Sequence, residues 1–262
     1  MGRDIADSAG FLAAGRRMMP ADNHTEMNQS ESKRAVGQAA AALVQDGMCV
    51  GLGTGSTTAF AIEALGASVH ERGMRITGVP TSFAAERLAR QHGIPLTTLD
   101  DVVELDLALD GADEVFSATD GKIHVIKGRG AAHTRERIVA GQARVFIVLA
   151  DASKRVARLG EKMPVPVEIL PMAVGPVDRA LRALGAVPEL RMGKRKDGPV
   201  VTDQGFWILD AGFSDISDAT GLAREVKQIP GVLDHGLFVG MAAEVLFGET
   251  DGSVTRQVAR SQ

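Results

Sequence analysis

The sequence predicts an α/β fold, a doubly wound and mostly parallel sheet with a smaller inserted α+β domain. Short apolar segments alternate with helix-forming segments between about residues 30 and 150, an order typical of parallel strands covered by helices. Glycine-rich and acidic turns follow several of the apolar segments. They therefore fall at the carboxyl ends of the expected strands, where sheets of this kind bind their ligands. After Lys154 the alternation stops, and prolines and turn residues separate shorter strands.

The larger domain is expected to comprise residues 29–159 and 235–257. Ser30 or Ser32 can cap a first helix, which ends at Asp46 and Gly47. Apolar segments predict strands over residues 48–50, 75–79, 105–109 and 144–149. Helices are expected between them, over residues 57–65, 82–91 and 134–140.

The remaining segments suggest a small domain and a tail. Within residues 160–234, the pattern predicts a strand over 165–170 and helices over 177–184 and 220–228. Residues 200–202 and 206–210 flank the turn at Gln204 and Gly205, which predicts a hairpin. Residues 1–28 show little periodicity, so we expect a disordered tail there.

Composition excludes several classes of protein. Hydrophobic residues make up 45% of the 262 residues and charged residues 24%, which is ordinary for a globular protein. The net charge of −4 argues against a general nucleic-acid binder, and no apolar run approaches the roughly 20 residues that span a bilayer. Cys49 is the single cysteine, so no intrachain disulfide is possible, and we expect a reducing compartment.

The glycine-rich stretch over residues 51–58 predicts an anion site. Glycines let the backbone approach a ligand closely, and the helix that follows presents unpaired N–H groups. Ser56, Thr57 and Thr58 add hydroxyl donors. The stretch lacks the third glycine of a dinucleotide motif and the lysine of a P-loop. A phosphorylated small molecule therefore fits better than NAD or ATP, with a plain strand–helix connection as the alternative.

A second cluster combines acids with a lysine. Asp110, Asp113 and Glu114 follow an apolar segment, where buried carboxylates are unfavourable unless they bind or react; the alternative is a solvated turn. Lys127 then begins another glycine turn, and Glu136 lies in the helix that follows. A lysine, two aspartates and a glutamate form a set suited to moving protons beside a carbonyl group.

Taken together, these motifs resemble the type A ribose-5-phosphate isomerases. The resemblance covers roughly residues 31–257, with every motif in the order of the family. It rests on the glycine loop at 51–57, the Asp-Gly-Ala-Asp-Glu turn at 110–114, the Lys-Gly-x-Gly-Ala-Ala-x-Thr-Arg-Glu segment at 127–136, and the segments 150–154, 164–171, 202–203, 208–210 and 229–232.

The resemblance implies an aldose–ketose isomerase that interconverts ribose 5-phosphate and ribulose 5-phosphate through an enediolate, without cofactor or metal. It implies that Glu136 is the base, that Lys127 stabilises the oxyanion, and that Asp110 and Asp113 bind sugar hydroxyls and assist ring opening. The implied substrate-binding residues are Thr54, Gly55, Ser56, Thr57, Gly111, Ala112, Gly128, Arg129 and Gly130, with Lys154 and Lys33 as anchors. We also expect a cytoplasmic homodimer or homotetramer of the pentose phosphate pathway, with a sugar phosphate as its partner and no nucleic acid or membrane.

The chain departs from the family pattern at three places. Arg129 stands at a position that is commonly glycine, and His133 at one that is commonly aliphatic. Residues 204–206 replace an Asn-Gly-Asn turn. We expect His133 to pack or to contact a neighbouring subunit rather than the substrate.

Three other interpretations share some of these features. A nicotinamide oxidoreductase would share the open sheet but not this glycine spacing. A non-catalytic, sugar-phosphate-sensing regulator would need a DNA-binding module, for which the tail has no room. Asp110, Asp113 and Glu114 offer the hard oxygen ligands that Mg²⁺ prefers, but Lys127 supplies a built-in cation instead.

Overall fold

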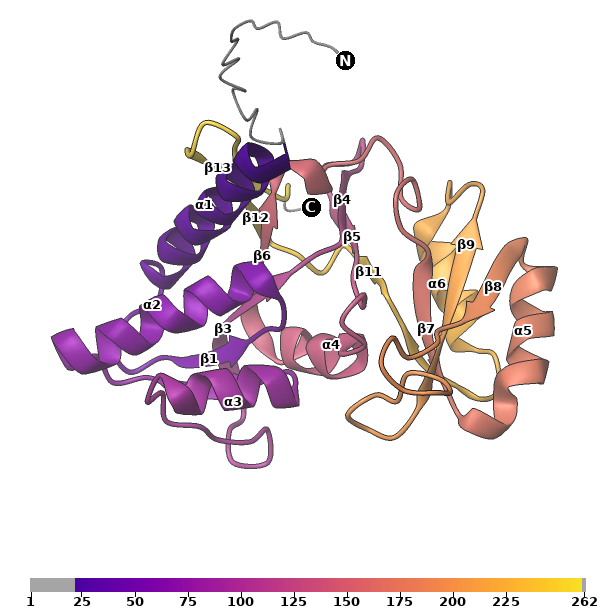
Figure 1. The fold of residues 1–262 in the computed structure, drawn as a ribbon, viewed down its shortest axis with the longest axis horizontal. Helices are drawn as coiled ribbons and strands as arrows, with labels where there is room; N and C mark the ends of the chain where they lie inside the picture. Colours follow the sequence, from indigo (N-terminus) through magenta and orange to yellow (C-terminus); the bar gives the residue numbers. More distant parts are fainter. Residues whose placement is uncertain (1–21, 261–262) are drawn as a thin grey trace, which may run out of the picture.

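A computed structural model describes the backbone of residues 22–260 and the side chains of residues 29–260. Its largest sheet has six strands in the order β13-β12-β6-β3-β1-β2, and all of them run parallel except the edge strand β13 (Figure 1). The strands are β1 (Cys49–Leu52), β2 (Thr77–Pro80), β3 (Leu105–Gly111), β6 (Ala143–Asp151), β12 (Glu244–Gly248) and β13 (Val254–Val258). The expected α/β class with a mostly parallel sheet is confirmed.

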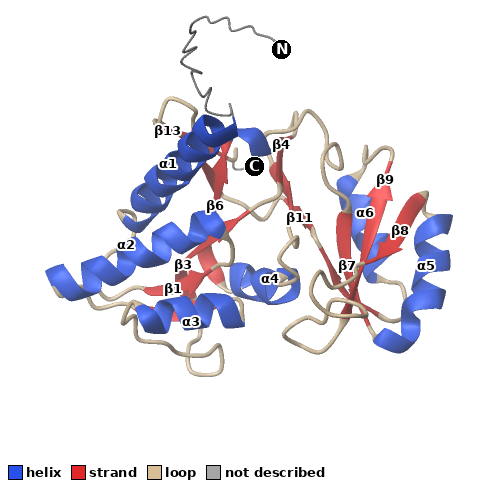
Figure 2. Ribbon diagram, in the orientation of Figure 1, coloured by secondary structure: helices blue, strands red, loops and turns tan. Residues whose placement is uncertain are grey.

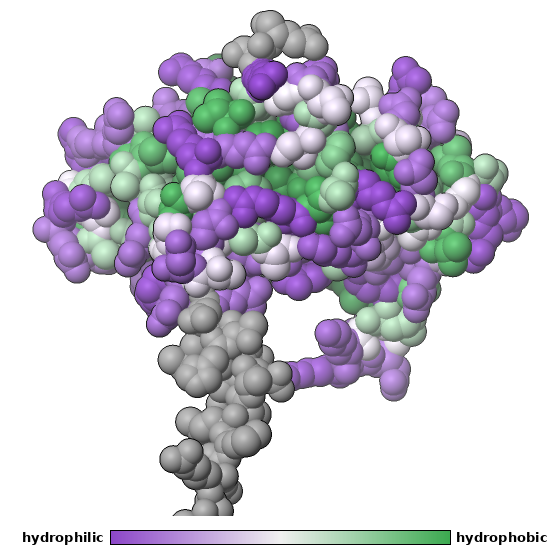
Figure 3. Space-filling model, turned by 90° about the horizontal axis from the view of Figure 1, so that it is seen from above, coloured by the Kyte–Doolittle hydropathy of each residue, from purple (hydrophilic) through white to green (hydrophobic). Residues whose placement is uncertain are grey.

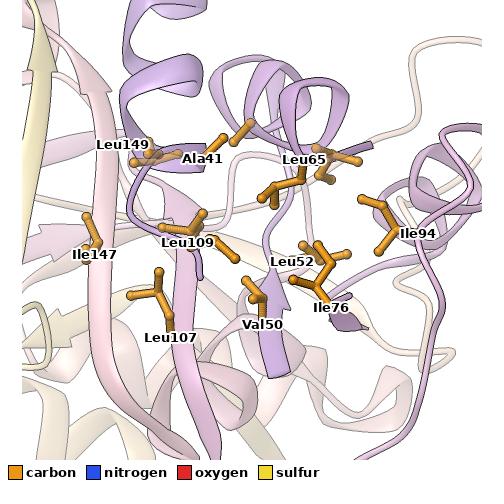
Figure 4. Packing of buried hydrophobic residues seen from close by; sticks show 14 of the residues in the cluster. Ala41, Val50, Leu52, Leu65, Ile76, Ile94, Leu107, Leu109, Ile147 and Leu149 are labelled. Atoms are coloured by element: carbon orange, nitrogen blue, oxygen red, sulfur yellow. The ribbon is translucent and has the colours of Figure 1, made fainter. Parts of the chain in front are cut away.

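Helices and a small sheet cover the two faces of this large sheet. The helices are α1 (Asp22–Ala41), α2 (Ser56–Arg72), α3 (Phe83–Gln91) and α4 (His133–Gly141). Leu107 and Leu109 of β3 face the core under α1 and α2 (Figure 4), whereas Ala108 between them faces the core under α4. This alternation follows from the two-residue period of a strand, so both faces of β3 are buried.

Two antiparallel sheets complete the molecule. The sheet β11-β5-β4 lies between the large sheet and a four-stranded sheet, β10-β7-β9-β8, against which α5 and α6 pack (Figures 1 and 2). The elements are β4 (Glu114–Ser117), β5 (Ile123–Ile126), β7 (Val165–Ile169), α5 (Val174–Ala183), β8 (Ala186–Leu190), β9 (Trp207–Phe213), α6 (Ala219–Lys227), β10 (Val232–His235) and β11 (Leu237–Val239), with short 3₁₀ helices η1 (Ala152–Lys154) and η2 (Pro171–Ala173). The four-stranded sheet comes from the segment where we expect the smaller domain, and the division at residues 160 and 234 stays a prediction.

Two local predictions were wrong. Helix α1 begins at Asp22, so Ser30 and Ser32 lie inside it, and the Ser32 hydroxyl donates to the carbonyl of Glu249 instead of capping the helix (2.7 Å). The expected tail therefore overlaps α1 at residues 22–28, and its residues 1–21 lie outside the described part of the chain.

The expected hairpin before β9 is also absent. Both edges of β9 are already paired, one with β7 and the other with β8. Residues 200–202 are therefore not a strand, and the Val200 amide donates to the carbonyl of Arg191 (2.8 Å). The turn itself forms, because the Thr202 amide donates to the carbonyl of Phe206 (2.9 Å).

The surface mixes hydrophilic and apolar side chains, as the face in Figure 3 shows. Within residues 22–260, no helix combines the length and the apolar character that a membrane crossing requires.

Candidate active site

Loops from the carboxyl ends of the parallel strands meet around a cavity of about 270 Å³. The loops after β1 and β3 line it, together with the turn between β5 and α4 and the end of β6. The cavity is lined by Gln29, Lys33, Thr54, Gly55, Ser56, Thr57, Gly111, Ala112, Asp113, Lys127, Gly128, Arg129, Gly130, Glu136, Leu149, Ala150, Asp151 and Lys154. Every catalytic or substrate-binding residue implied by the family resemblance lines this cavity except Asp110, whose carboxylate contacts Lys127.

Lys127 bridges two buried carboxylates. Its Nζ lies 3.2 Å from Asp110 Oδ2 and 3.2 Å from Glu136 Oε2, and it donates a hydrogen bond to the carbonyl of Gly111. The three charged side chains are only 3–5% exposed. Among the described protein groups, neither carboxylate oxygen has another hydrogen-bond partner. One ammonium therefore serves two carboxylates, and the triad is short of positive charge.

Burial and the charges of the triad together set the pKa values of its members. Burial raises the pKa of Glu136 to about 8, and the charge of Asp110 adds to the rise, whereas Lys127 opposes it. Burial also raises the pKa of Asp110 against the pull of Lys127 and two amides. Burial by itself would lower the pKa of Lys127, but the surrounding carboxylates outweigh it and raise the pKa. The lysine stays charged while a proton can reside on a carboxylate, the condition for acid–base work near neutral pH.

The first glycine loop packs directly against Asp110. Oδ1 of this aspartate accepts from the amides of Thr54 (3.0 Å) and Gly111 (2.7 Å). A Cβ on Gly53 would lie 2.3 Å from the Asp110 carboxylate, so only glycine fits there. The loop therefore fixes the carboxylate, in addition to opening helix α2.

The start of α2 offers the cavity an uncapped helix N-terminus. Gly55 occupies the N-cap position with φ +124°, and no side chain caps the helix. No acidic residue lies in the first turn, and the hydroxyl-bearing Ser56 and Thr57 line the cavity with Lys33 and Lys154. Hydroxyls, unpaired amides and two ammonium groups thus line the same cavity, a combination that suits an anion.

Six residues at or beside this site were missed as site residues from the sequence: Gln29, Leu149, Ala150 and Asp151 line the cavity, and Thr81 and Ser82 contact its first glycine loop. Thr54 Oγ1 lies 2.9 Å from Thr81 Oγ1 and 2.6 Å from Ser82 Oγ, at the carboxyl end of β2. The sequence predicts Ser82 only as the start of a helix, and Ser82 is the N-cap of α3. The position of Thr81 and Ser82 just after a parallel strand was the available signal.

The second glycine turn holds Asp113. The Arg129 amide donates to Asp113 Oδ2 (2.9 Å), and Arg129 Nε lies 3.5 Å from Oδ1. Gly128 has φ +106°, and a Cβ there would lie 2.7 Å from the Nδ1 atom of His133. Arg129 does not share the left-handed conformation, so its position accepts a side chain where the family commonly has glycine.

Three sequence candidates lie away from the cavity. Glu114 accepts from the amides of Gly160 and Met163, both at 2.7 Å, and so anchors a neighbouring loop. Thr58 is buried behind the substrate loop. His133 is fully buried against Gly128, and burial lowers its pKa to about 3, so its ring is neutral. Within residues 29–260, no three His, Cys, Asp or Glu side chains are grouped as metal ligands.

The sequence of this chain is similar to those of known proteins. Residues 77–252 match the family model described as ribose 5-phosphate isomerase A (phosphoriboisomerase A). The chain is 57% identical over 220 residues to ribose-5-phosphate isomerase A of Thermosynechococcus vestitus, covering 84% of this chain and 92% of that protein.

Solved structures agree with the sequence matches. The structure of ribose 5-phosphate isomerase A from Methanocaldococcus jannaschii superposes with a TM-score of 0.84 at 45% identity, covering 88% of this chain and 99% of that one. A D-ribose-5-phosphate isomerase in complex with phospho-erythronic acid superposes with a TM-score of 0.85 at 43% identity, covering 89% and 100%.

Proposed function

The chain belongs to the ribose 5-phosphate isomerase A family and interconverts ribose 5-phosphate and ribulose 5-phosphate, and we propose that Glu136 and Lys127 carry out the proton transfer. The observation that carries this assignment is the buried ammonium of Lys127, 3.2 Å from each of two carboxylates, at the wall of the cavity. Such a group of charges can exchange a proton and stabilise a developing oxyanion without solvent rearrangement.

The proposed steps balance within the sugar and these side chains. Glu136, as carboxylate, removes the proton from C2 of the open-chain aldose. The electron pair of that C–H bond forms the C1–C2 double bond, and the carbonyl oxygen on C1 becomes an oxyanion beside Lys127. The proton of the C2 hydroxyl then passes to the oxyanion on C1, and the electron pair of its O–H bond forms the C2 carbonyl. The electrons of the C1–C2 double bond take the proton back from Glu136 onto C1, which gives the ketose. Asp113, and Asp110 behind Lys127, are proposed to bind sugar hydroxyls and assist ring opening.

The phosphate is proposed to bind at the start of α2. The uncapped helix N-terminus, Ser56, Thr57 and the lysines Lys33 and Lys154 support this placement. Replacing both Ser56 and Thr57 by alanine should raise KM for ribose 5-phosphate strongly. The already poor reaction of unphosphorylated ribose should change much less. Equal losses on both sugars would place the phosphate elsewhere.

An isotope experiment tests the chemistry itself. Purified protein is given ribose 5-phosphate in D₂O, and ribulose 5-phosphate is measured together with deuterium on its C1 carbon. A carboxylate that carries the proton between carbons can exchange it with solvent, so we expect partial incorporation. Complete retention of the original hydrogen would indicate a hydride shift and would remove Glu136 from its role.

The cellular setting is proposed on the family assignment. We place the enzyme in the cytoplasm, in the pentose phosphate pathway, as a homodimer or homotetramer with residues 160–234 as a separate small domain. Light scattering of the full chain after gel filtration tests the assembly, and a mass equal to one chain would contradict it.

A further inference from the structure

An arginine from the four-stranded sheet contacts the second glycine turn from outside the cavity. Arg191 directly follows β8, and its Nη1 donates to the carbonyls of Gly128 (2.9 Å) and Arg129 (3.1 Å). Its Nε donates to Asp210 Oδ2 on β9 (2.8 Å), and its Nη2 bonds to the other carboxylate oxygen. The two side chains are 16% and 22% exposed. The guanidinium is therefore itself held in place where it meets the turn.

The turn depends on such outside contacts, because it belongs to no helix or sheet. Gly128 is in the left-handed region, and Ala131 in the same turn is the only residue other than glycine with a positive φ among residues 22–260. Within the turn, the Ala131 amide donates to the carbonyl of Gly128 (3.0 Å). Arg191 adds the two contacts that fix consecutive carbonyls on the side away from the cavity.

One peptide group connects Arg191 to Asp113. In the rigid, planar peptide between Gly128 and Arg129, the carbonyl and the N–H point in opposite directions. The carbonyl accepts from Arg191, and the N–H donates to Asp113 Oδ2 (2.9 Å). Turning this peptide would therefore break both bonds together. The orientation of the Asp113 carboxylate is linked to a guanidinium on the opposite side of the turn.

We propose that Arg191, fixed by Asp210, is a positioning residue for substrate binding. It sets the orientation of the turn at Gly128–Gly130 and, through the Arg129 amide, of the Asp113 carboxylate that meets the sugar. The proposal rests on the assignment of Asp113 and this turn to the substrate. A bond between two parts of the fold could instead serve stability alone, so the test must separate the two.

Kinetics of Arg191→Ala separate them, because KM does not depend on how much of the enzyme is folded. We expect KM for ribose 5-phosphate to rise on the order of tenfold, the size of one lost charge-assisted hydrogen bond, with a smaller fall in kcat. Millimolar guanidinium chloride should lower KM again, and sodium chloride at the same concentration should not. The matched control is Arg182→Ala in the same sheet unit, where Arg182 pairs with Asp178 (2.8 Å) away from the cavity and should leave KM unchanged.

A double-mutant cycle tests the route through Asp113. If Arg191 acts by orienting that carboxylate, Arg191→Ala should add little to the rise in KM caused by Asp113→Asn. Fully additive effects, or an unchanged KM in Arg191→Ala, would overturn the proposal. Should Arg191→Ala not fold, Arg191→Lys carries the test. The ammonium of lysine can bond one carbonyl but lacks the planar guanidinium that bonds the two carbonyls and Asp210 together. An intermediate KM therefore supports the proposal, and a parental KM overturns it. An inactive parent protein would instead refute the proposed function.

Discussion

Glu136 and Arg137 are neighbours on α4 and both bury a charge, but their surroundings differ. Glu136 shares one lysine with Asp110, and its Oε2 has no hydrogen-bond partner among the described residues. Arg137 bonds to Asp234 Oδ2 (2.7 Å) and to the carbonyls of His235 (2.6 Å) and Leu237 (2.8 Å), and it lies 4.2 Å from the ring centre of Phe238.

This difference in surroundings distinguishes a charge that is proposed to react, that of Glu136, from one that stabilises the fold, that of Arg137. Consecutive helical residues point about 100° apart, so α4 directs Glu136 to the cavity and Arg137 to β10 and β11. The Arg137 side chain has partners on most of its donors and fastens the helix. The Glu136 side chain has few partners, and its burial together with the charge of Asp110 keeps its pKa high.

The largest effect should come from Glu136→Gln, which keeps the shape and removes the base. We expect kcat to fall on the order of 100-fold or more with a modest change in KM. Thermal unfolding should show no loss of stability, because a neutral amide is easier to bury than a carboxylate. The matched control is Glu114→Gln, another buried carboxylate, which should lower stability and leave kcat intact. Activity of Glu136→Gln within a few-fold of the parent would remove it as the base.

Arg137→Met should show the opposite pattern. Asp234 would lose its main partner, with Lys227 Nζ at 3.6 Å as partial compensation, so unfolding in urea should show a loss of about 2 kcal/mol. KM should stay near that of the parent. A large change in KM without a loss of stability would mean that Arg137 contributes to substrate binding rather than to the stability of the fold.

The pH profile sharpens the comparison, because Glu136 must be ionised to accept a proton. Its pKa is raised to about 8, so kcat/KM should be low below that pH and rise through it. The apparent pKa belongs to the triad as a whole. Asp110→Asn removes the negative charge that helps to raise the pKa of Glu136, so the rise in kcat/KM should move to lower pH. A profile that does not move would show that Asp110 and Glu136 are not coupled.

The smallest effect is expected at the edge of the reactive cluster. Arg129→Gly restores the residue common in the family and removes only the exposed Nε contact to Asp113, since the amide contact remains. Such a pair is worth about 0–1 kcal/mol, so KM should change within about fivefold. A change as large as that of Arg191→Ala would mean that the Arg129 side chain, rather than its amide, holds Asp113.

The sequence was sufficient for the parts of the site that lie close together along the chain. Strand–turn–helix order placed Thr54 and Gly128 on turns and Glu136 in a helix, and the structure lines one cavity with all three, although the Gly128 turn follows β5 of the antiparallel sheet rather than a strand of the large sheet. Glycine patterns also carry local information, since Gly53 leaves room for the Asp110 carboxylate. Thr58 shows the limit, because the position of a residue in a motif does not say which way its side chain points, whereas His133 packs in the interior as expected.

Contacts between distant segments could not be predicted. Arg191 reaches Gly128 and Arg137 reaches Asp234 only because of how the four-stranded sheet packs against α4. The expected hairpin failed for the same reason, since its second arm, β9, is enclosed by β7 and β8. Short strands such as β4 and β11 have no period long enough to detect.

The strand order also determines when the site can form during synthesis. Strand β12 lies beside β6 in the large sheet although it is among the last to leave the ribosome, and the amide of Lys127 donates to the carbonyl of Gly236 just before β11 (2.9 Å). A nascent chain that stops before Gly236 already contains every residue proposed to act on the sugar. It still lacks Gly236, which binds the Lys127 amide, and strands β12 and β13 at one edge of the sheet, so the active site can be completed only after these late segments pair with earlier ones.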